Sequence, residues 1–229
     1  MRELVCFWRW WSMSDVVKAT RRVPTLQARL LRLRWGFRAD NETRLRLVNI
    51  PVETIIWEQR FPFNMRGANA VVGVGKGGWD TLVHPFSATP IYRSLQARFA
   101  EGKAWQETVL FQHAVADFSA GRKSWNSCRN EHDLFDRCTA LDRLYDDMSV
   151  HGYRPQYLSK WNRSVRGTAV PDETRIAITR EGHAVRCVSG RHRVAMAKLI
   201  GIAEIPAIVQ IRHASAPPAG EIIREIPIA

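Results

Sequence analysis

Apolar residues follow two different periods in the C-terminal third of the chain, and the change between them predicts a hairpin followed by a helix. Two short runs rich in β-branched residues, 176–179 and 184–188, flank a turn at Gly182, which is the pattern of a β-hairpin. The next stretch, 194–200, is rich in helix formers and ends at Gly201, a residue typical of the position just after a helix. The sequence therefore predicts strand, turn, strand and helix in that order.

The same patterns predict further elements upstream. Apolar residues at helical spacing, with suitable capping residues, indicate helices at 24–37, 90–99 and 131–149, the last in one or two parts. The apolar stretch 109–118 fits either a helix or a strand. A short apolar run with a proline, 49–55, is the candidate first strand.

Between the predicted second hairpin strand and the predicted helix lies the run Ser189-Gly190-Arg191-His192-Arg193. It places two arginines and a histidine in the first turn of a helix, where free N–H groups and the macrodipole already present positive charge. More positive charge there is unfavourable unless an anion shares the site, so the run predicts a phosphate site. The alternative is that both arginines pair with acidic residues elsewhere in the chain.

These elements resemble the ParB/sulfiredoxin-type domain in residues 141–213. The segment 144–155 is similar to the family's element in which a helix ends at a glycine and feeds a loop with a proline. The hairpin and 189–193 follow, similar to the family's D-G-R/H-H-R signature, and 201–211 resembles its last strand. The run 49–55 resembles its first strand, so the elements occur in the family's order.

The resemblance implies an α+β fold, with a small mixed sheet packed by helices on one side. It assigns this domain to 45–213, with a large and mostly helical insertion at about 58–140. A basic N-terminal extension carrying the amphipathic helix, 1–44, precedes the domain, and a tail, 214–229, follows it.

Known members of the family include CTP-dependent DNA clamps, ATP- or ADP-dependent small-molecule kinases and sulfiredoxin. The resemblance implies that Ser189, Gly190, Arg191, His192 and Arg193 bind nucleotide phosphates. Sulfiredoxin has its catalytic cysteine where this chain has Arg191, which argues against sulfinic acid repair. The kinase-like members have aspartate where this chain has Ser189, and serine cannot replace a carboxylate in holding a metal or accepting a proton.

Phosphoryl transfer needs a carboxylate to hold a metal ion or to accept the substrate proton. Asp142 and Asp146 are four apart and share one helix face, so they are candidate catalytic acids. Asp80 is a third, because it follows the glycine-rich stretch 71–80, in which Lys76 and backbone amides either form a flap over phosphates or belong to an ordinary hairpin or loop. For each acid the alternative is a solvated helix face paired with Arg137 or Arg143.

Composition adds a strong charge asymmetry. The chain has 229 residues, 34 Lys and Arg against 22 Asp and Glu, a net charge of +12 and a pI near 10.3, a balance that attracts polyanions. Residues 1–46 supply more than half of the net charge. The helix at 24–37 therefore either packs on the domain, contacts an anionic membrane surface or contacts a nucleic-acid backbone.

Cysteine and histidine spacing excludes the common metal sites. The four cysteines form no C-x-x-C pair, which favours a reducing, cytoplasmic setting, and the histidines show no zinc spacing. We therefore expect a nucleotide-phosphate-binding protein that takes ATP, ADP or CTP, with or without Mg²⁺, and acts as a small-molecule kinase or NTPase. The alternatives are a DNA-associated ParB-like module and a non-enzymatic nucleotide-sensing protein.

Overall fold

The computed structural model describes most of the chain from the first strand onward. The described residues are 36, 46–59, 73–81, 83–125, 128–156, 161–163, 169–171, 173–218 and 224–225. The predicted helix at 24–37 and most of the tail after Pro218 lie outside these residues.

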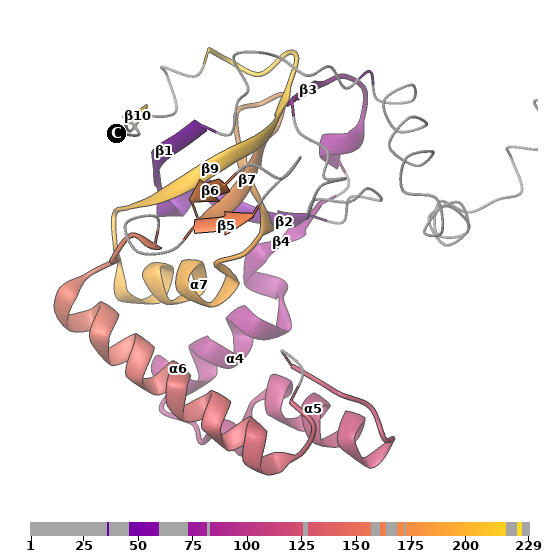
Figure 1. Ribbon diagram of the computed structural model, residues 1–229, viewed down its shortest axis with the longest axis vertical. Helices are drawn as coiled ribbons and strands as arrows, with labels where there is room; N and C mark the ends of the chain where they lie inside the picture. Colours follow the sequence, from indigo (N-terminus) through magenta and orange to yellow (C-terminus); the bar gives the residue numbers. More distant parts are fainter. Residues whose placement is uncertain are drawn as a thin grey trace, which may run out of the picture.

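A mixed β-sheet forms the centre of the molecule (Figure 1). Seven strands follow the order β10-β1-β9-β7-β8-β2-β4, and β3 pairs with β9 beside that path. The bounds are β1 Arg46–Pro51, β2 Ile55–Gln59, β3 Gly73–Gly75, β4 Val83–Pro85, β7 Thr174–Ile178, β8 Ala184–Val188, β9 Glu204–His213 and β10 Arg224–Glu225. Strands β5 (Trp161–Arg163) and β6 (Ala169–Pro171) form a separate two-stranded sheet.

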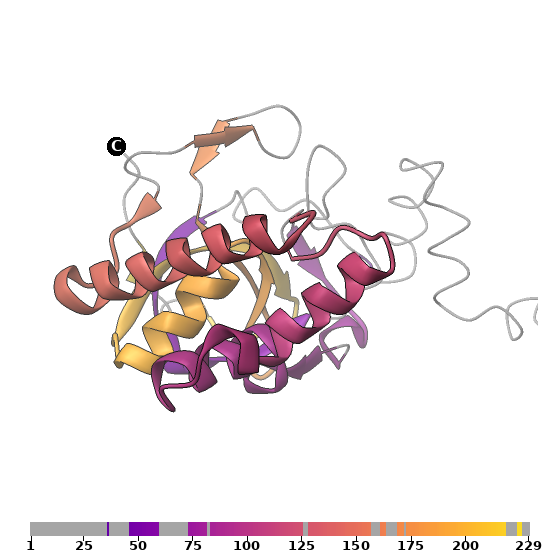
Figure 2. The ribbon, with the colours of Figure 1, turned by 90° about the horizontal axis from the view of Figure 1, so that it is seen from below.

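The helices gather on one face of this sheet, as Figures 1 and 2 show from two directions. They are α4 (Pro90–Phe99), α5 (Val109–Ser119), α6 (Glu131–His151) and α7 (Arg191–Ile200). Apolar side chains of α7, such as Val194 and Met196, share one buried cluster with Ile176 and Ile178 of β7. The opposite face has a smaller cluster around the fully buried Trp79. A mixed sheet with helices on one side is therefore confirmed.

The C-terminal elements form where their turn residues allow. Gly182 turns the β7–β8 hairpin with φ of 86°, and Gly201 ends α7 in the left-handed conformation. Upstream, Thr89 caps α4 by accepting a hydrogen bond from Tyr92 N at 3.2 Å. The predicted hairpin turn, the predicted end of α7 and the predicted cap of α4 are therefore confirmed. Where the sequence left alternatives open, the stretch 109–118 is helical and α6 is one continuous helix.

Two upstream predictions need correction. The run 49–55 is not one strand, because β1 ends at Pro51 and a 3₁₀ turn over 52–54 leads into β2. The segment 58–140 is not only helical, because β3 and β4 lie within it and both pair with the main sheet. Very short strands of three residues carry too little periodicity to be seen in a sequence.

Strand directions determine which loops meet. β2 runs parallel to β8, so both end at the same edge of the sheet, where α7 begins. β7 runs antiparallel to β8 and parallel to β9, and β3 is parallel to β9, so β7, β9 and β3 end at the opposite edge. A five-residue strand at about 3.3 Å per residue separates the two edges by roughly 16 Å.

Within the described residues, no helix is both long and apolar enough to cross a membrane.

Candidate functional site: arginines at the start of α7

The turn before α7 has a backbone that few residues tolerate. Ser189 has φ of 60°, the one described non-glycine residue with positive φ, and Gly190 follows with φ of 65°. A methyl group at Gly190 would overlap the side chain of Thr174, so only glycine fits there. The N-cap residue of α7 is Gly190, which has no side chain to accept from the first N–H groups of the helix, and no other described residue caps them.

Two arginines at this edge share a single carboxylate oxygen. Glu58 and Arg186 are neighbours in register on the parallel strands β2 and β8. The guanidinium groups of Arg186 and Arg191 both donate to Oε1 of Glu58. The Glu58 and Arg186 side chains are only 4% and 3% exposed, whereas that of Arg191 is 42% exposed. We call Glu58, Arg186, Arg191 and the first turn of α7 the arginine site.

This site has more positive charge than its carboxylate balances. Oε2 of Glu58 and the Nε atoms of Arg186 and Arg191 are buried without a hydrogen-bond partner among the described residues. Burial lowers the pKa of Arg186 below its usual value; the charge of Glu58 works against that shift and the charge of Arg191 adds to it. Arg186 is thus a buried cation that its own surroundings support incompletely.

Arg193 differs in having a carboxylate of its own, although its Nη1 is buried without a hydrogen-bond partner among the described residues. It lies 3.8 Å from the buried carboxylate of Glu173 and stacks over the ring of Tyr153, with 3.9 Å from Cζ to the ring centroid. Tyr153 donates to Glu173 at 2.9 Å, and Arg193 also donates to the carbonyl of Arg154. Arg193 therefore joins α7 to the segment after α6, so for this arginine the predicted alternative, pairing with an acid elsewhere, is observed.

His192 faces the helical layer. Trp125 Nε1 donates to His192 Nε2 at 3.2 Å, so this ring nitrogen carries no proton. Burial, followed by the positive charges of Arg137, Arg191 and Arg186, lowers the pKa of His192 to about 3. The histidine is therefore neutral at physiological pH, chiefly because it is buried and further because the nearby cations oppose its protonation.

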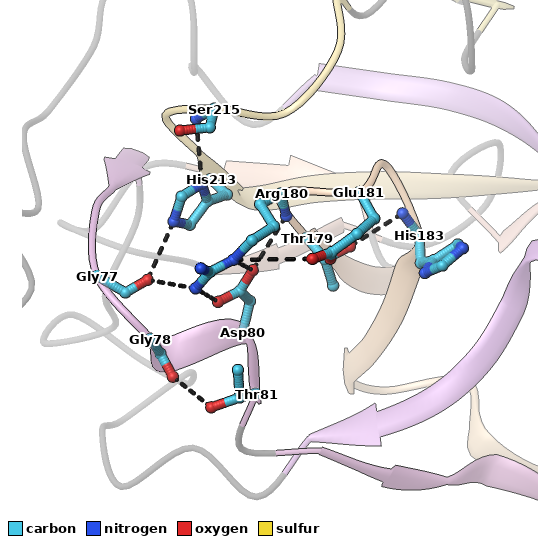
Figure 3. A network of polar contacts seen from close by, with 10 residues as sticks. All are labelled: Gly77, Gly78, Asp80, Thr81, Thr179, Arg180, Glu181, His183, His213 and Ser215. Carbon is cyan, nitrogen blue, oxygen red and sulfur yellow. Dashed lines mark hydrogen bonds and ion pairs between the residues drawn. The ribbon is translucent and has the colours of Figure 1, made fainter.

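Lys76 and Asp80 lie at the other edge of the sheet, where Figure 3 shows Asp80 beside Arg180. Lys76 is exposed and directly follows β3. The side chain of Asp80, 2% exposed, accepts hydrogen bonds from Arg180: from its backbone N at 3.0 Å, from Nε at 2.8 Å and from Nη2 at 2.5 Å. The structure does not bring either residue to the Ser189–Arg193 turn.

Neighbours on both sides complete the Asp80–Arg180 pair. Arg180 also donates to the carbonyl of Gly77 at 2.8 Å, and His213 Nε2 lies 3.0 Å from the same oxygen. Ser215 N donates to His213 Nδ1 at 3.0 Å, which leaves Nε2 as the protonated nitrogen. Burial alone would raise the pKa of Asp80, but the hydrogen bonds from Arg180 hold it below its usual value.

Asp142 and Asp146 are not brought to the Ser189–Arg193 turn either. Asp142 forms a two-pronged ion pair with Arg98 of α4, both distances 3.1 Å, and accepts from Trp105 Nε1 at 3.0 Å. Asp146 is exposed on α6. Asp142 thus joins α6 to α4: it is a paired carboxylate, but its arginine is Arg98 of another helix and not the expected Arg137 or Arg143.

Sequence reasoning missed the carboxylate and the buried arginine that make the site. Glu58 ends a mostly apolar strand, and Arg186 interrupts the apolar run 184–188, so each was visible as a charge inside a strand pattern. A buried charge in such a run requires a partner. The pairing itself depends on β2 lying beside β8, which nothing in the sequence indicates.

Comparisons with known proteins yield no relative: no family model, no curated protein and no solved structure matches this chain. Among the residues that the structure describes, no group of three or more His, Cys, Asp or Glu side chains is placed to hold a metal ion.

Proposed function

We propose that this chain binds the phosphate group of a nucleotide at the arginine site, in a domain of ParB/sulfiredoxin-like architecture. One observation carries the proposal: two guanidinium groups share one oxygen of one buried carboxylate, beside an uncapped helix N-terminus. This arrangement holds a net positive charge, and an anion would balance it.

Arg191 is the group that would move to the ligand. Its side chain is far more exposed than that of Arg186, so it can leave Glu58 at little cost in packing. Glu58 and Arg186 would then remain as a balanced pair, and Arg191 would bind phosphate together with the N–H groups of α7.

Nucleotide binding is the core of this proposal, and phosphoryl transfer to a small molecule is its extension. Lys76 and Asp80 lie across the sheet, and Asp142 and Asp146 contact other parts of the helical layer or solvent. Phosphoryl transfer at this site would therefore have to use Glu58, the carboxylate that contacts Arg191. This placement favours a binding or sensing role over catalysis by the predicted aspartates.

The test is thermal unfolding with ATP, ADP, CTP and GTP, each with and without Mg²⁺. A ligand at 100 times its Kd stabilises the native state by about 2.7 kcal/mol, which gives a clear rise in melting temperature. Arg191→Gln should abolish the rise, and Arg143→Gln, an exposed arginine on α6, should leave it unchanged. No rise with any nucleotide would contradict the proposal and would direct attention to nucleic acid or an anionic membrane surface.

A further inference from the structure

Arg137 is a half-buried arginine of α6 that has no partner among the residues that the structure describes. It makes no hydrogen bond or ion pair with any described residue, and its Nε is buried without an acceptor. Other arginines of this layer are matched: Arg98 by Asp142 and Arg122 by Asp117. Burying an unpaired arginine costs free energy of folding, and a bound anion would supply the missing negative charge.

Helical periodicity directs Arg137 inward. α6 buries Leu134, Cys138 and Leu141 along one stripe of its surface. Arg137 is three, one and four positions away from these residues, so it borders the same inward-facing stripe. Phe135, on the other flank of that stripe, contacts Phe111 of α5. Arg137 therefore projects from the flank that does not face α5.

The arginine site is on that side. α6 packs against α7, and Trp125, in the loop before α6, is hydrogen-bonded to His192 in the first turn of α7. The positive charges of Arg137, Arg191 and Arg186 all act on the His192 ring, so the three guanidinium groups lie within electrostatic range of it. Glu58 balances one of the three.

We propose that Arg137 forms a second anion subsite beside the arginine site, and that the ligand therefore carries two linked phosphoryl groups. This inference rests on the proposed function and specifies its ligand. One phosphoryl group binds Arg191 and the N–H groups of α7, and the adjoining one binds Arg137. The chemical class is a diphosphate, whether inorganic or part of a nucleoside diphosphate or triphosphate.

The test compares inorganic phosphate with inorganic pyrophosphate by titration calorimetry, without metal and at constant ionic strength. The wild-type chain should bind pyrophosphate at least about tenfold more tightly, the effect of one added charge-assisted contact. Arg137→Gln should reduce that preference to about twofold or less. Arg143→Gln removes the same charge from the exposed face of the same helix and should retain the full preference.

Each outcome decides between the two proposals. If Arg137→Gln keeps the preference while Arg191→Gln abolishes binding of both anions, the second subsite is wrong and the first remains. If neither anion binds the wild-type chain, the arginine site itself is wrong and the subsite falls with it. ADP and AMP, compared in the same way, show whether the diphosphate is part of a nucleotide.

The melting temperature of the unliganded variant provides a second readout. Because Arg137 is an uncompensated charge, Arg137→Gln should leave this temperature unchanged or raise it. A purely structural arginine would lower it on replacement. A marked fall in the melting temperature of Arg137→Gln, with Arg143→Gln unaffected, would therefore contradict the subsite.

Discussion

Two arginine–carboxylate groups lie at opposite edges of the same sheet, and they differ in how completely they are balanced. At one edge Arg180 pairs with Asp80, lies 3.8 Å from a second carboxylate, that of Glu181, and also donates to Gly77. At the other edge Arg186 and Arg191 share one oxygen of Glu58, and each of the three side chains has a buried polar atom without a partner among the described residues. Both groups are partly or fully buried, so burial does not distinguish them.

The difference separates a structural ion pair from a candidate binding site. A balanced pair with every oxygen occupied has nothing to offer a ligand. A site with more cations than carboxylates has a deficit of negative charge that an anion can fill. Charge balance, more than the presence of arginines, is what distinguishes the two edges.

The largest expected effect comes from removing the shared carboxylate. Glu58→Gln leaves Arg186 buried and uncompensated beside Arg191, which should lower the free energy of unfolding by about 3 kcal/mol. Inorganic phosphate should restore much of this loss, because it replaces the missing negative charge. Urea unfolding with and without phosphate measures both effects. Phosphate that protects the variant no more than the wild type would contradict the anion site.

A smaller loss is expected at the balanced edge. Asp80→Asn keeps an acceptor for the backbone N of Arg180 but removes the charge, which should cost about 2 kcal/mol. Here phosphate should give no selective rescue. The pKa of Asp80 is held low, so its contribution is complete above the unfolded value of about 3.9 and is lost as the pH falls further. Urea unfolding of wild type and variant should therefore show a smaller difference in stability at pH 3 than at pH 7.

His192 offers the smallest and most selective probe. The native pKa of this histidine is about 3, against about 6.5 when unfolded, so the unfolded state binds the extra proton first. Stability from this group is therefore complete above pH 6.5 and declines as the pH falls toward 3. His192→Gln should abolish this dependence, so that between pH 7.5 and pH 5 the wild type loses about 2 kcal/mol more than the variant. An equal loss of stability in the two proteins on urea unfolding would show that burial and the nearby cations do not hold His192 neutral.

Local patterns predicted the elements that surround the site. The hairpin at Gly182, the helix that ends at Gly201 and the capped helix after Thr89 all form as their residues suggest. Each depends on contacts within a few positions of the chain, such as a turn glycine or a capping hydroxyl. This is why the Ser189–Arg193 run could be placed at a helix N-terminus from sequence alone.

The partners of that run could not be predicted, because they come from distant parts of the chain. Glu58 precedes Arg186 by 128 positions and meets it only because β2 lies beside β8. Asp80 and Lys76 looked like site residues because a glycine-rich turn precedes them, but strand direction places them across the sheet. Arg137 was an expected partner for the acids of its own helix. That it has no partner among the described residues is visible only in three dimensions.

The sheet also makes the two edges thermodynamically independent. A strand of five residues keeps them about 16 Å apart, beyond the range at which substitutions normally influence each other. Changes at the Asp80 edge and at the Glu58 edge should therefore add in a double-mutant cycle, with a coupling energy near zero. Stability could then be engineered at one edge of this protein without altering what the other edge binds.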